Sequence, residues 1–358
     1  MKKVLALILV VVLAAAAFAG CSAPAAQESA STQPSEAATT EATDSTESAA
    51  PAAADGDLTI GIALMDYNYT FFQDMLAAAK MEAEAQGVKL VDVDGGNDVQ
   101  QQLEGVEDMI TGSHINALIL NPVDSAAIGT ATLQANEAGI PVVTVDIRSE
   151  EGEVVAHVAS DNKDIGRQSA EMAVETLKEK NGSETGTVLV VGMDQITSVR
   201  DRTEGFMEYM EQYPDIEIIK QDPVNYVVEG SQELVTNLLQ TYPEGKLDII
   251  FGGNSTNAMG AFAAVEAAGR TDVLIQGVDD DPVELEAIEK GDIFLSTIVQ
   301  SPTDMGKLAV QIAVAAAKGE EITEKEVATE LTLVNKDNIA EFYEAYNANQ
   351  AALEPYKS

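Results

Sequence analysis

The sequence predicts an α/β fold of two doubly wound lobes, each a parallel sheet with helices on both faces. From residue 58 onward, apolar runs of strand length alternate with stretches of helix length. The strand runs are continuously apolar, which is typical of parallel sheets covered on both sides. The alternation pauses at 151–161 and then begins again. This repetition indicates two similar lobes joined near 159–162.

The elements of the first lobe follow from this alternation in order. Strands are predicted at 58–65, 88–94, 117–121 and 141–146, and helices at 70–86, 98–112 and 125–138. Gly87 and Gly139 directly follow two of these helices, and glycine is a common helix terminator. After residue 161 the pattern repeats. Strands are predicted at 187–193, 216–221, 247–252, 272–279, 294–299 and 330–334, and helices at 163–179, 199–212, 230–241, 257–268, 282–291 and 303–318.

The N-terminal segment has the layout of a secretory signal peptide, predicted over 1–20. Lys2 and Lys3 precede an apolar run over 4–19, which is shorter than the roughly 20 residues that cross a bilayer. Residues 18–21 resemble the bacterial lipobox, whose cysteine is acylated, although Phe18 stands where leucine is usual. Cys21 is the only cysteine. An ordinary secreted protein with an incidental cysteine remains the alternative.

The segment after Cys21 is predicted to be a disordered tether. Residues 22–54 are almost entirely Ala, Ser, Thr, Glu, Gln and Pro, which bury too little apolar surface to order a chain. A cysteine carrying two acyl chains would anchor stably. We therefore expect a lipidated Cys21 and linker over 21–56 that hold the folded body at the outer face of a bacterial cell membrane.

Composition excludes several classes of function. Sixty acidic residues against 20 Lys and Arg give a net charge of −40, which disfavours nucleic acid as a partner. The acidic turn at 92–97 has Leu103 where a calcium loop needs glutamate, so no metal site is predicted. His114 and His157 lack a nucleophile or metal partner by spacing. The glycines at 252–253 are too few for a dinucleotide fingerprint, so no cofactor is expected.

Ligands of doubly wound sheets bind outside the carboxyl ends of the strands. The residues expected there combine aromatic rings with carboxylates, amides and a guanidinium, and offer almost nothing that attacks a bond. They comprise Tyr69, Phe71, Phe72, Asp146, Arg200, Tyr226, Asn254, Asp279 and Gln300. Structural alternatives remain for individual members. The phenylalanines also suit a core, the aspartates suit caps, and Arg200 suits an ion pair on a helix surface.

Several stretches in the same order carry a family likeness: 70–72, 120–124, 152–162, 200–206, 277–279 and 298–300. With them, the chain resembles the type I periplasmic sugar-binding proteins of ABC importers, most closely the D-ribose-binding branch, from about 58 to 334. The resemblance implies sugar contacts at Phe71, Phe72, Asp146, Arg200, Tyr226, Asn254, Asp279 and Gln300. Three positions depart from the ribose pattern: Tyr69 replaces an asparagine, Ile147 an arginine and Val278 an aromatic residue.

The residue types suit a monosaccharide or polyol. Aromatic rings can pack on its C–H faces, carboxylates accept protons from its hydroxyls, and a guanidinium donates to them. Because one donor and one ring of the ribose pattern are missing, the identity of the sugar stays open. We expect a binding protein that is not an enzyme, works as a monomer and delivers its ligand to an ABC permease.

The resemblance also implies lobes that hinge about the ligand, with crossings near 160–161, 300–301 and 330. We expect the N-terminal lobe at 57–160 plus 301–329 and the C-terminal lobe at 161–300 plus 330–358. Two alternatives share the fold. A sensor would present the ligand to a chemoreceptor or membrane kinase, whereas a lactose-repressor-type regulator would need a DNA-binding segment that the signal peptide and the acidity oppose.

Overall fold

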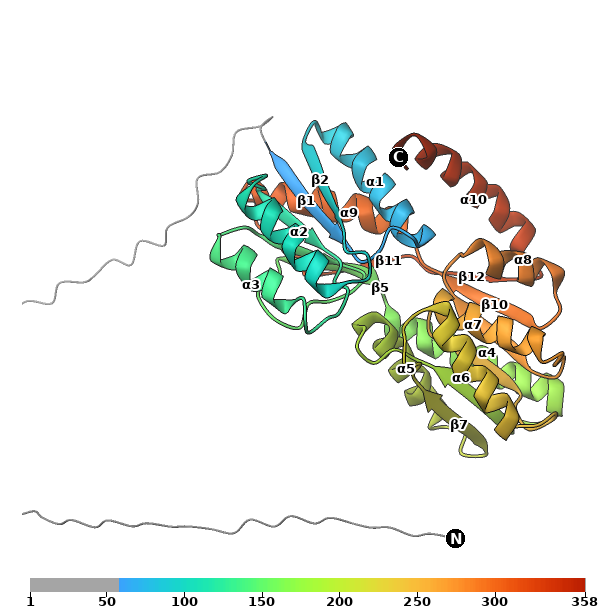
Figure 1. Cartoon of the computed structure of the whole chain (residues 1–358). Coiled ribbons are helices and arrows are strands. Elements are labelled where there is room, and N and C mark those ends of the chain that lie inside the picture. Colours follow the sequence, from blue (N-terminus) through green and yellow to red (C-terminus); the bar gives the residue numbers. More distant parts are fainter. Residues whose placement is uncertain (1–57, 358) are drawn as a thin grey trace, which may run out of the picture. The chain divides into compact units, whose positions relative to one another are not determined.

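The computed structural model describes residues 58–357 and contains two six-stranded sheets with helices on both sides (Figure 1). The predictions for the signal peptide 1–20, for Cys21 and for the linker 21–56 therefore lie outside the described residues. The sheets run in the orders β11-β5-β4-β3-β1-β2 and β12-β10-β9-β8-β6-β7. These two orders are equivalent, so the predicted fold class of two doubly wound lobes is confirmed.

In the first lobe, the sheet is covered on both faces by helices of that lobe. Its strands are β1 (Thr59–Leu64), β2 (Lys89–Asp94), β3 (Ala117–Leu120), β4 (Val142–Val145), β5 (Ala156–Ser160) and β11 (Glu326–Thr329). Its helices are α1 (Thr70–Gln86), α2 (Val99–Thr111), α3 (Gly129–Glu137) and α9 (Pro302–Ala317). One core lies between the sheet and α1 with α9, and another lies beneath α2 and α3. Helix α2 begins where Asp98 caps it, its carboxylate accepting from Gln101 N.

The second lobe has the same layers. Its strands are β6 (Gly186–Val191), β7 (Ile216–Gln221), β8 (Ile249–Gly252), β9 (Leu274–Val278), β10 (Phe294–Val299) and β12 (Thr332–Asn335). Its helices are α4 (Asn162–Asn181), α5 (Thr197–Met210), α6 (Val228–Thr241), α7 (Ser255–Ala267) and α8 (Pro282–Lys290). Helices α4 and α5 cover one core, and α6, α7 and α8 cover the other. All pairings in both sheets are parallel except β10 with β12.

Two short strands went unrecognised in the sequence. The segment 151–161 was expected to be a connection, but Ala156–Ser160 forms β5, and Glu326–Thr329 pairs with it as β11. The last strand begins at Thr332 rather than at 330. The chain passes between the sheets at three points: from β5 to α4, from β10 to α9, and from β11 to β12.

Helix α10 (Ile339–Leu353) and the 3₁₀ turn η1 (Glu354–Tyr356) were not predicted. Ile339 at the start of α10 joins the core of the second lobe, whereas Leu353 at its end packs on Ala77 and Ala78 of α1. Lys357 pairs with the buried Asp74 of α1 at 2.5 Å. The segment 330–358, expected to belong to the second lobe alone, therefore contacts both lobes. Among residues 58–357, no helix has the length and apolar character needed to cross a bilayer.

Helices α4 and α5 approach so closely that their crossing requires glycine. A Cβ on Gly205 would lie 2.2 Å from the carbonyl oxygen of Lys163, and one on Gly166 would lie 1.9 Å from the carbonyl oxygen of Arg202. Both distances are far below van der Waals contact, so any side chain there must push the helices apart. The crossing therefore fixes the position of Arg202 relative to the start of α4.

We predict that Gly205→Ala lowers the free energy of unfolding by about 1–3 kcal/mol, because the added methyl group overpacks the α4–α5 crossing. Urea unfolding of the purified protein measures this. Glu208→Ala is the matched control on the same helix, since its partner Lys163 is half exposed and such surface pairs contribute about 0–1 kcal/mol. Equal stability of the two variants would contradict the close packing described here.

Candidate ligand-binding site

A cavity lined by both lobes lies at the carboxyl ends of the strands. It encloses about 560 Å³ of empty space, a figure that includes its open mouth. Eight of the nine residues expected to bind ligand line it; Arg200 does not. The eight are Tyr69, Phe71, Phe72, Asp146, Tyr226, Asn254, Asp279 and Gln300.

Asp146 and Asp279 occupy equivalent positions, directly after β4 and β9. Both have positive φ angles, 58° and 96°, which are uncommon for residues other than glycine, although aspartate tolerates this region better than most. Each main-chain N–H still pairs with the neighbouring strand, to Val158 O at 2.8 Å and to Ile298 O at 3.0 Å. The strained turn thus presents each carboxylate at a strand end while the sheet hydrogen bonds are kept.

Asp146 is a buried carboxylate with an incomplete set of partners. Asn121 Nδ2 donates to Asp146 Oδ2 at 3.3 Å, and Oδ1 is buried without a hydrogen bond. The guanidinium of Arg202 lies 3.9 Å from Oδ1. Burial raises the pKa of Asp146 to about 6, since the opposing effect of Arg202 is smaller and the nearby Asp279 raises it further. A ligand hydroxyl that donates to Oδ1 would supply the hydrogen bond that this oxygen lacks.

Asp279, in contrast to Asp146, has a hydrogen-bond partner for each of its carboxylate oxygens. Gln300 Nε2 donates to Oδ1 at 2.6 Å, and the main-chain N–H of Ser255 donates to Oδ2 at 3.1 Å. Gln300 Oε1 is buried without a hydrogen bond, and the residue lines the same cavity. Asn254 caps α7 through its Oδ1, which accepts from Asn257 N, and this leaves its amide Nδ2 beside Met193 Sδ at 3.6 Å. The second lobe therefore supplies carboxylate and amide groups.

Arg202, and not the predicted Arg200, lines the cavity. Arg202 is only 2% exposed, and it donates to Asn162 Oδ1 at 2.8 Å and to Gly253 O at 2.9 Å. Arg200 instead lies outside the cavity lining and pairs with Glu150 at 2.8 Å. The two arginines are two residues apart on α5, where side chains point to different faces. Arg200 thus forms an ion pair that joins the two lobes, and not the ion pair on a helix surface that was the alternative for it.

Aromatic rings gather at the start of α1. Phe71 and Phe72 meet edge to face with centroids 5.2 Å apart, and Tyr69 contacts Phe72 in the same way at 6.3 Å. Burial raises the pKa of Tyr69, chiefly because the phenolate is desolvated. Tyr226 reaches the cavity from the loop before α6. Rings from both lobes are thus available for stacking.

Five aliphatic and thioether side chains form a further part of the lining, called here the apolar wall. Four of them are at most 4% exposed and pack as one cluster with Tyr226. The wall consists of Met65, Ile147, Met193, Ile196 and Val199. Of the departures from the ribose pattern, Ile147 belongs to this wall, whereas Val278 is buried in the core between β9 and α5 and does not line the cavity.

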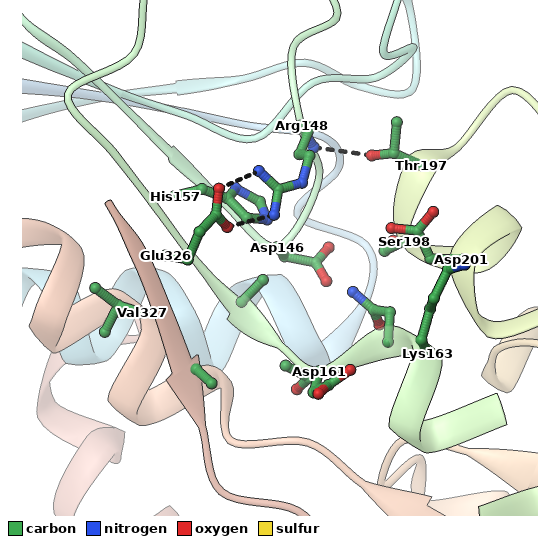
Figure 2. A pocket seen from close by; sticks show the side chains of 14 residues that line it. Asp146, Arg148, His157, Asp161, Lys163, Thr197, Ser198, Asp201, Glu326 and Val327 are labelled. Carbon is green, nitrogen blue, oxygen red and sulfur yellow. Dashed lines mark hydrogen bonds and ion pairs between the residues drawn. The ribbon is translucent and has the colours of Figure 1, made fainter. Parts of the chain in front are cut away.

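Asp146 also borders a second cavity, next to the crossing from β5 to α4 (Figure 2). Figure 2 shows Arg148 paired with Glu326 there, through hydrogen bonds of 3.0 and 2.5 Å. His157 is buried, with its Nδ1 2.9 Å from Thr144 Oγ1, and burial together with Arg148 lowers its pKa to about 3. The side chain of Arg148 is therefore held by Glu326 and does not replace the donor missing at Ile147.

The lobes touch beside the cavity through short polar contacts. Ser125 Oγ and Thr197 Oγ1 lie 3.2 Å apart, and the main-chain N–H of Arg148 donates to Thr197 Oγ1 at 2.9 Å. The ion pair between Glu150 and Arg200 joins the same two lobes. These contacts are formed by residues that also border or adjoin the cavity, so its walls depend on the two lobes being together.

The side chains that line the cavity are aromatic, aliphatic, thioether, hydroxyl, amide and carboxylate groups with one guanidinium. Among the described residues that line the cavity there is no histidine, lysine or cysteine. Residues 58–357 contain no group of three or more His, Cys, Asp or Glu side chains placed to hold a metal ion. In the acidic turn after β2, Asp94 Oδ1 accepts from the N–H groups of Tyr67 and Gly96, as in an ordinary polar turn.

We predict that Arg202→Gln raises the pKa of Asp146 above about 6, because the nearest positive charge is removed while the carboxylate stays buried. Titration of the Asp146 carboxyl carbon by NMR, in protein without ligand, measures the midpoint. Arg200→Gln is the control and should leave the midpoint unchanged. A larger shift in the control would contradict the assignment of Arg202 as the arginine of the site.

Comparison with known proteins agrees with this geometry. Residues 60–321 match the family described as the periplasmic binding protein domain. The ribose import binding protein of Salmonella typhimurium is 31% identical over 268 residues, which are 75% of this chain and 87% of the relative. A solute-binding protein structure from Mycobacterium smegmatis with bound glycerol is 33% identical with a TM-score of 0.73, over 80% of this chain and 96% of that one.

A second solved structure is of a Bacillus halodurans solute-binding protein with bound myo-inositol. It is 28% identical with a TM-score of 0.72, and the match covers 82% of this chain and 99% of that one. The family match spans more than half of the sequence, and it covers every strand of the two sheets except β11, β12 and the first residue of β1. The chain therefore belongs to the periplasmic binding protein family.

Proposed function

We propose that this protein captures a monosaccharide or polyol outside the cytoplasm and delivers it to an ABC permease. The carrying observation is that Asp146, Arg202, Asp279 and Gln300 converge from two lobes on one cavity that also holds aromatic rings. Acceptor-only carboxylates and a donor-only guanidinium match hydroxyls, which both donate and accept. The relatives named for ribose import and solved with polyols support this class of ligand.

Closure of the lobes is the proposed mechanism of capture. A hydroxyl near Asp146 Oδ1 would meet a carboxylate from the first lobe and the Arg202 guanidinium from the second, whose partner Asn162 lies at the crossing into α4. A ligand that contacts both lobes binds their closed arrangement more tightly and shifts the population towards it. The permease would then distinguish the closed form from the open one.

The proposed role is transport and not turnover. Hydrogen bonds to charged groups contribute about 1.5–3 kcal/mol each, so a few of them with ring stacking reach micromolar affinity, about −8 kcal/mol. The signal peptide predicted over 1–20 and the lipobox-like Cys21, both outside the described residues, are the basis for proposing a lipid anchor at the outer face of the membrane. Such an anchor would keep the binding body beside its permease.

A thermal-shift screen of the full chain against pentoses, hexoses, inositols and linear polyols tests the proposed function. A ligand at 100 times its dissociation constant stabilises the folded state by about 2.7 kcal/mol, so the Tm should rise by several degrees. Amino acids and nucleosides at the same concentration are the comparison classes. A shift confined to those classes, or none with any sugar or polyol, would overturn the proposal.

Once a ligand is found, we predict that Asp279→Asn weakens its binding at least about tenfold, because a charged acceptor becomes neutral while its volume and backbone tolerance are kept. Calorimetry measures the dissociation constant. Arg200→Gln, which removes a charge outside the cavity lining, should change it less than about threefold. If Asp279→Asn binds as the unmodified protein does, Asp279 is not a ligand contact.

A further inference from the structure

The apolar wall differs from the rest of the cavity lining because it offers nothing to a hydroxyl. It contains no side-chain oxygen or nitrogen, and its members from both lobes pack into one cluster. The charged groups and the Gln300 amide stand elsewhere, at Asp146, Arg202, Asp279 and Gln300, while the hydroxyls of Ser198 and Tyr226 adjoin the wall. The cavity is therefore polar on one part of its lining and apolar on another.

Three main-chain N–H groups of the wall already have partners within the protein. The N–H of Ile147 donates to Val145 O at 2.6 Å, and the N–H of Ile196 donates to Met193 O at 3.0 Å. The N–H of Met65 donates to Asn121 Oδ1 at 3.1 Å. Neither side chains nor these N–H groups can pair with a hydroxyl placed against the wall.

The nearest cations cannot supply the missing donor. The Arg148 guanidinium is held by Glu326 in the second cavity, as Figure 2 shows. The Arg202 guanidinium is fixed by Asn162 and Gly253 beside Asp146. Asn254 Nδ2 points to Met193 Sδ, a weak acceptor. A ligand hydroxyl held against the aliphatic and thioether side chains of the wall, out of reach of Asn254 and of the hydroxyls of Ser198 and Tyr226, would lose its water without gaining a partner.

We propose that the ligand is a deoxy sugar, whose methyl or deoxy carbon lies against the apolar wall while its hydroxylated edge faces Asp146, Arg202, Asp279 and Gln300. This inference rests on the proposed function and narrows the class of ligand. A methyl group gains apolar contact at the wall, whereas a hydroxyl there is buried unpaired. The expected discrimination is about tenfold to a hundredfold in affinity.

Four pairs of sugars that differ by one hydroxyl test the inference by calorimetry with the full chain. The pairs are L-fucose with L-galactose, L-rhamnose with L-mannose, D-fucose with D-galactose, and 5-deoxy-D-ribose with D-ribose. In the pair that binds most tightly, the deoxy sugar should bind at least about tenfold more tightly than its partner. Equal or tighter binding of the fully hydroxylated partner overturns the inference.

Two outcomes separate this inference from the proposed function. Binding confined to ligands with a hydroxyl on every ring carbon, such as myo-inositol, overturns the deoxy-sugar inference and leaves the proposed function standing. Failure of every sugar and polyol to bind overturns both. The two sugars of each pair share their stereochemistry and differ by one hydroxyl. The comparison within a pair therefore measures the effect of that hydroxyl on affinity.

Met193→Gln provides the matched variant, since it keeps the side-chain length and places an amide donor and acceptor in the wall. The preference for the deoxy sugar should then fall to less than about threefold, or reverse, as the hydroxyl gains a partner. Met81→Gln, on α1 and outside the cavity lining, should keep the preference of the unmodified protein. An unchanged preference in Met193→Gln contradicts contact between the ligand and the wall.

Discussion

The burial of one carboxylate at the end of β4 is the constraint on which the cavity depends. Asp146 retains an oxygen without a hydrogen bond, and the groups that offset its charge come from different parts of the fold. Asn121 belongs to the end of β3, while Arg202 belongs to α5 of the other lobe. Arg202 is in turn fixed by the close α4–α5 crossing at Gly166 and Gly205. Helix packing in one lobe thus sets the electrostatics of the other.

The duplicated strand order explains why polar groups face each other across the cavity. Asp146 and Asp279 follow equivalent strands, and so do Asn121 and Asn254. The two asparagines nevertheless have different roles in the two lobes. Asn121 is fully buried and orients Asp146, whereas Asn254 caps a helix at the cavity edge. One framework therefore supports a hydrogen-bonding region and an apolar region, and this asymmetry can fix the orientation of a bound ring.

Most of the sheet strands could be predicted from sequence because a continuously apolar run has few alternatives to a buried strand. β5 and β11 could not, because they are short and pair residues such as Ser160 and Thr329 that are 169 positions apart. The strand-end rule located eight cavity residues. It could not choose between Arg200 and Arg202, since the side chain that faces a cavity depends on where α5 begins and how it packs. The apolar wall was equally hidden, because Met65 and Ile147 are distant in sequence from Met193 and Ile196.

The C-terminal segment adds a connection that the chain path alone does not provide. Three crossings join the lobes covalently, and α10 reaches from the core of the second lobe to α1 of the first. Because α10 is already attached, the contact between Lys357 and Asp74 is intramolecular and acts at a high effective concentration. If the lobes separate, α10 must either move with both of them or lose its contact with α1. A reporter fused to the C-terminus would therefore disturb this contact between the lobes. A label on an exposed helix of one lobe would leave the contact unchanged.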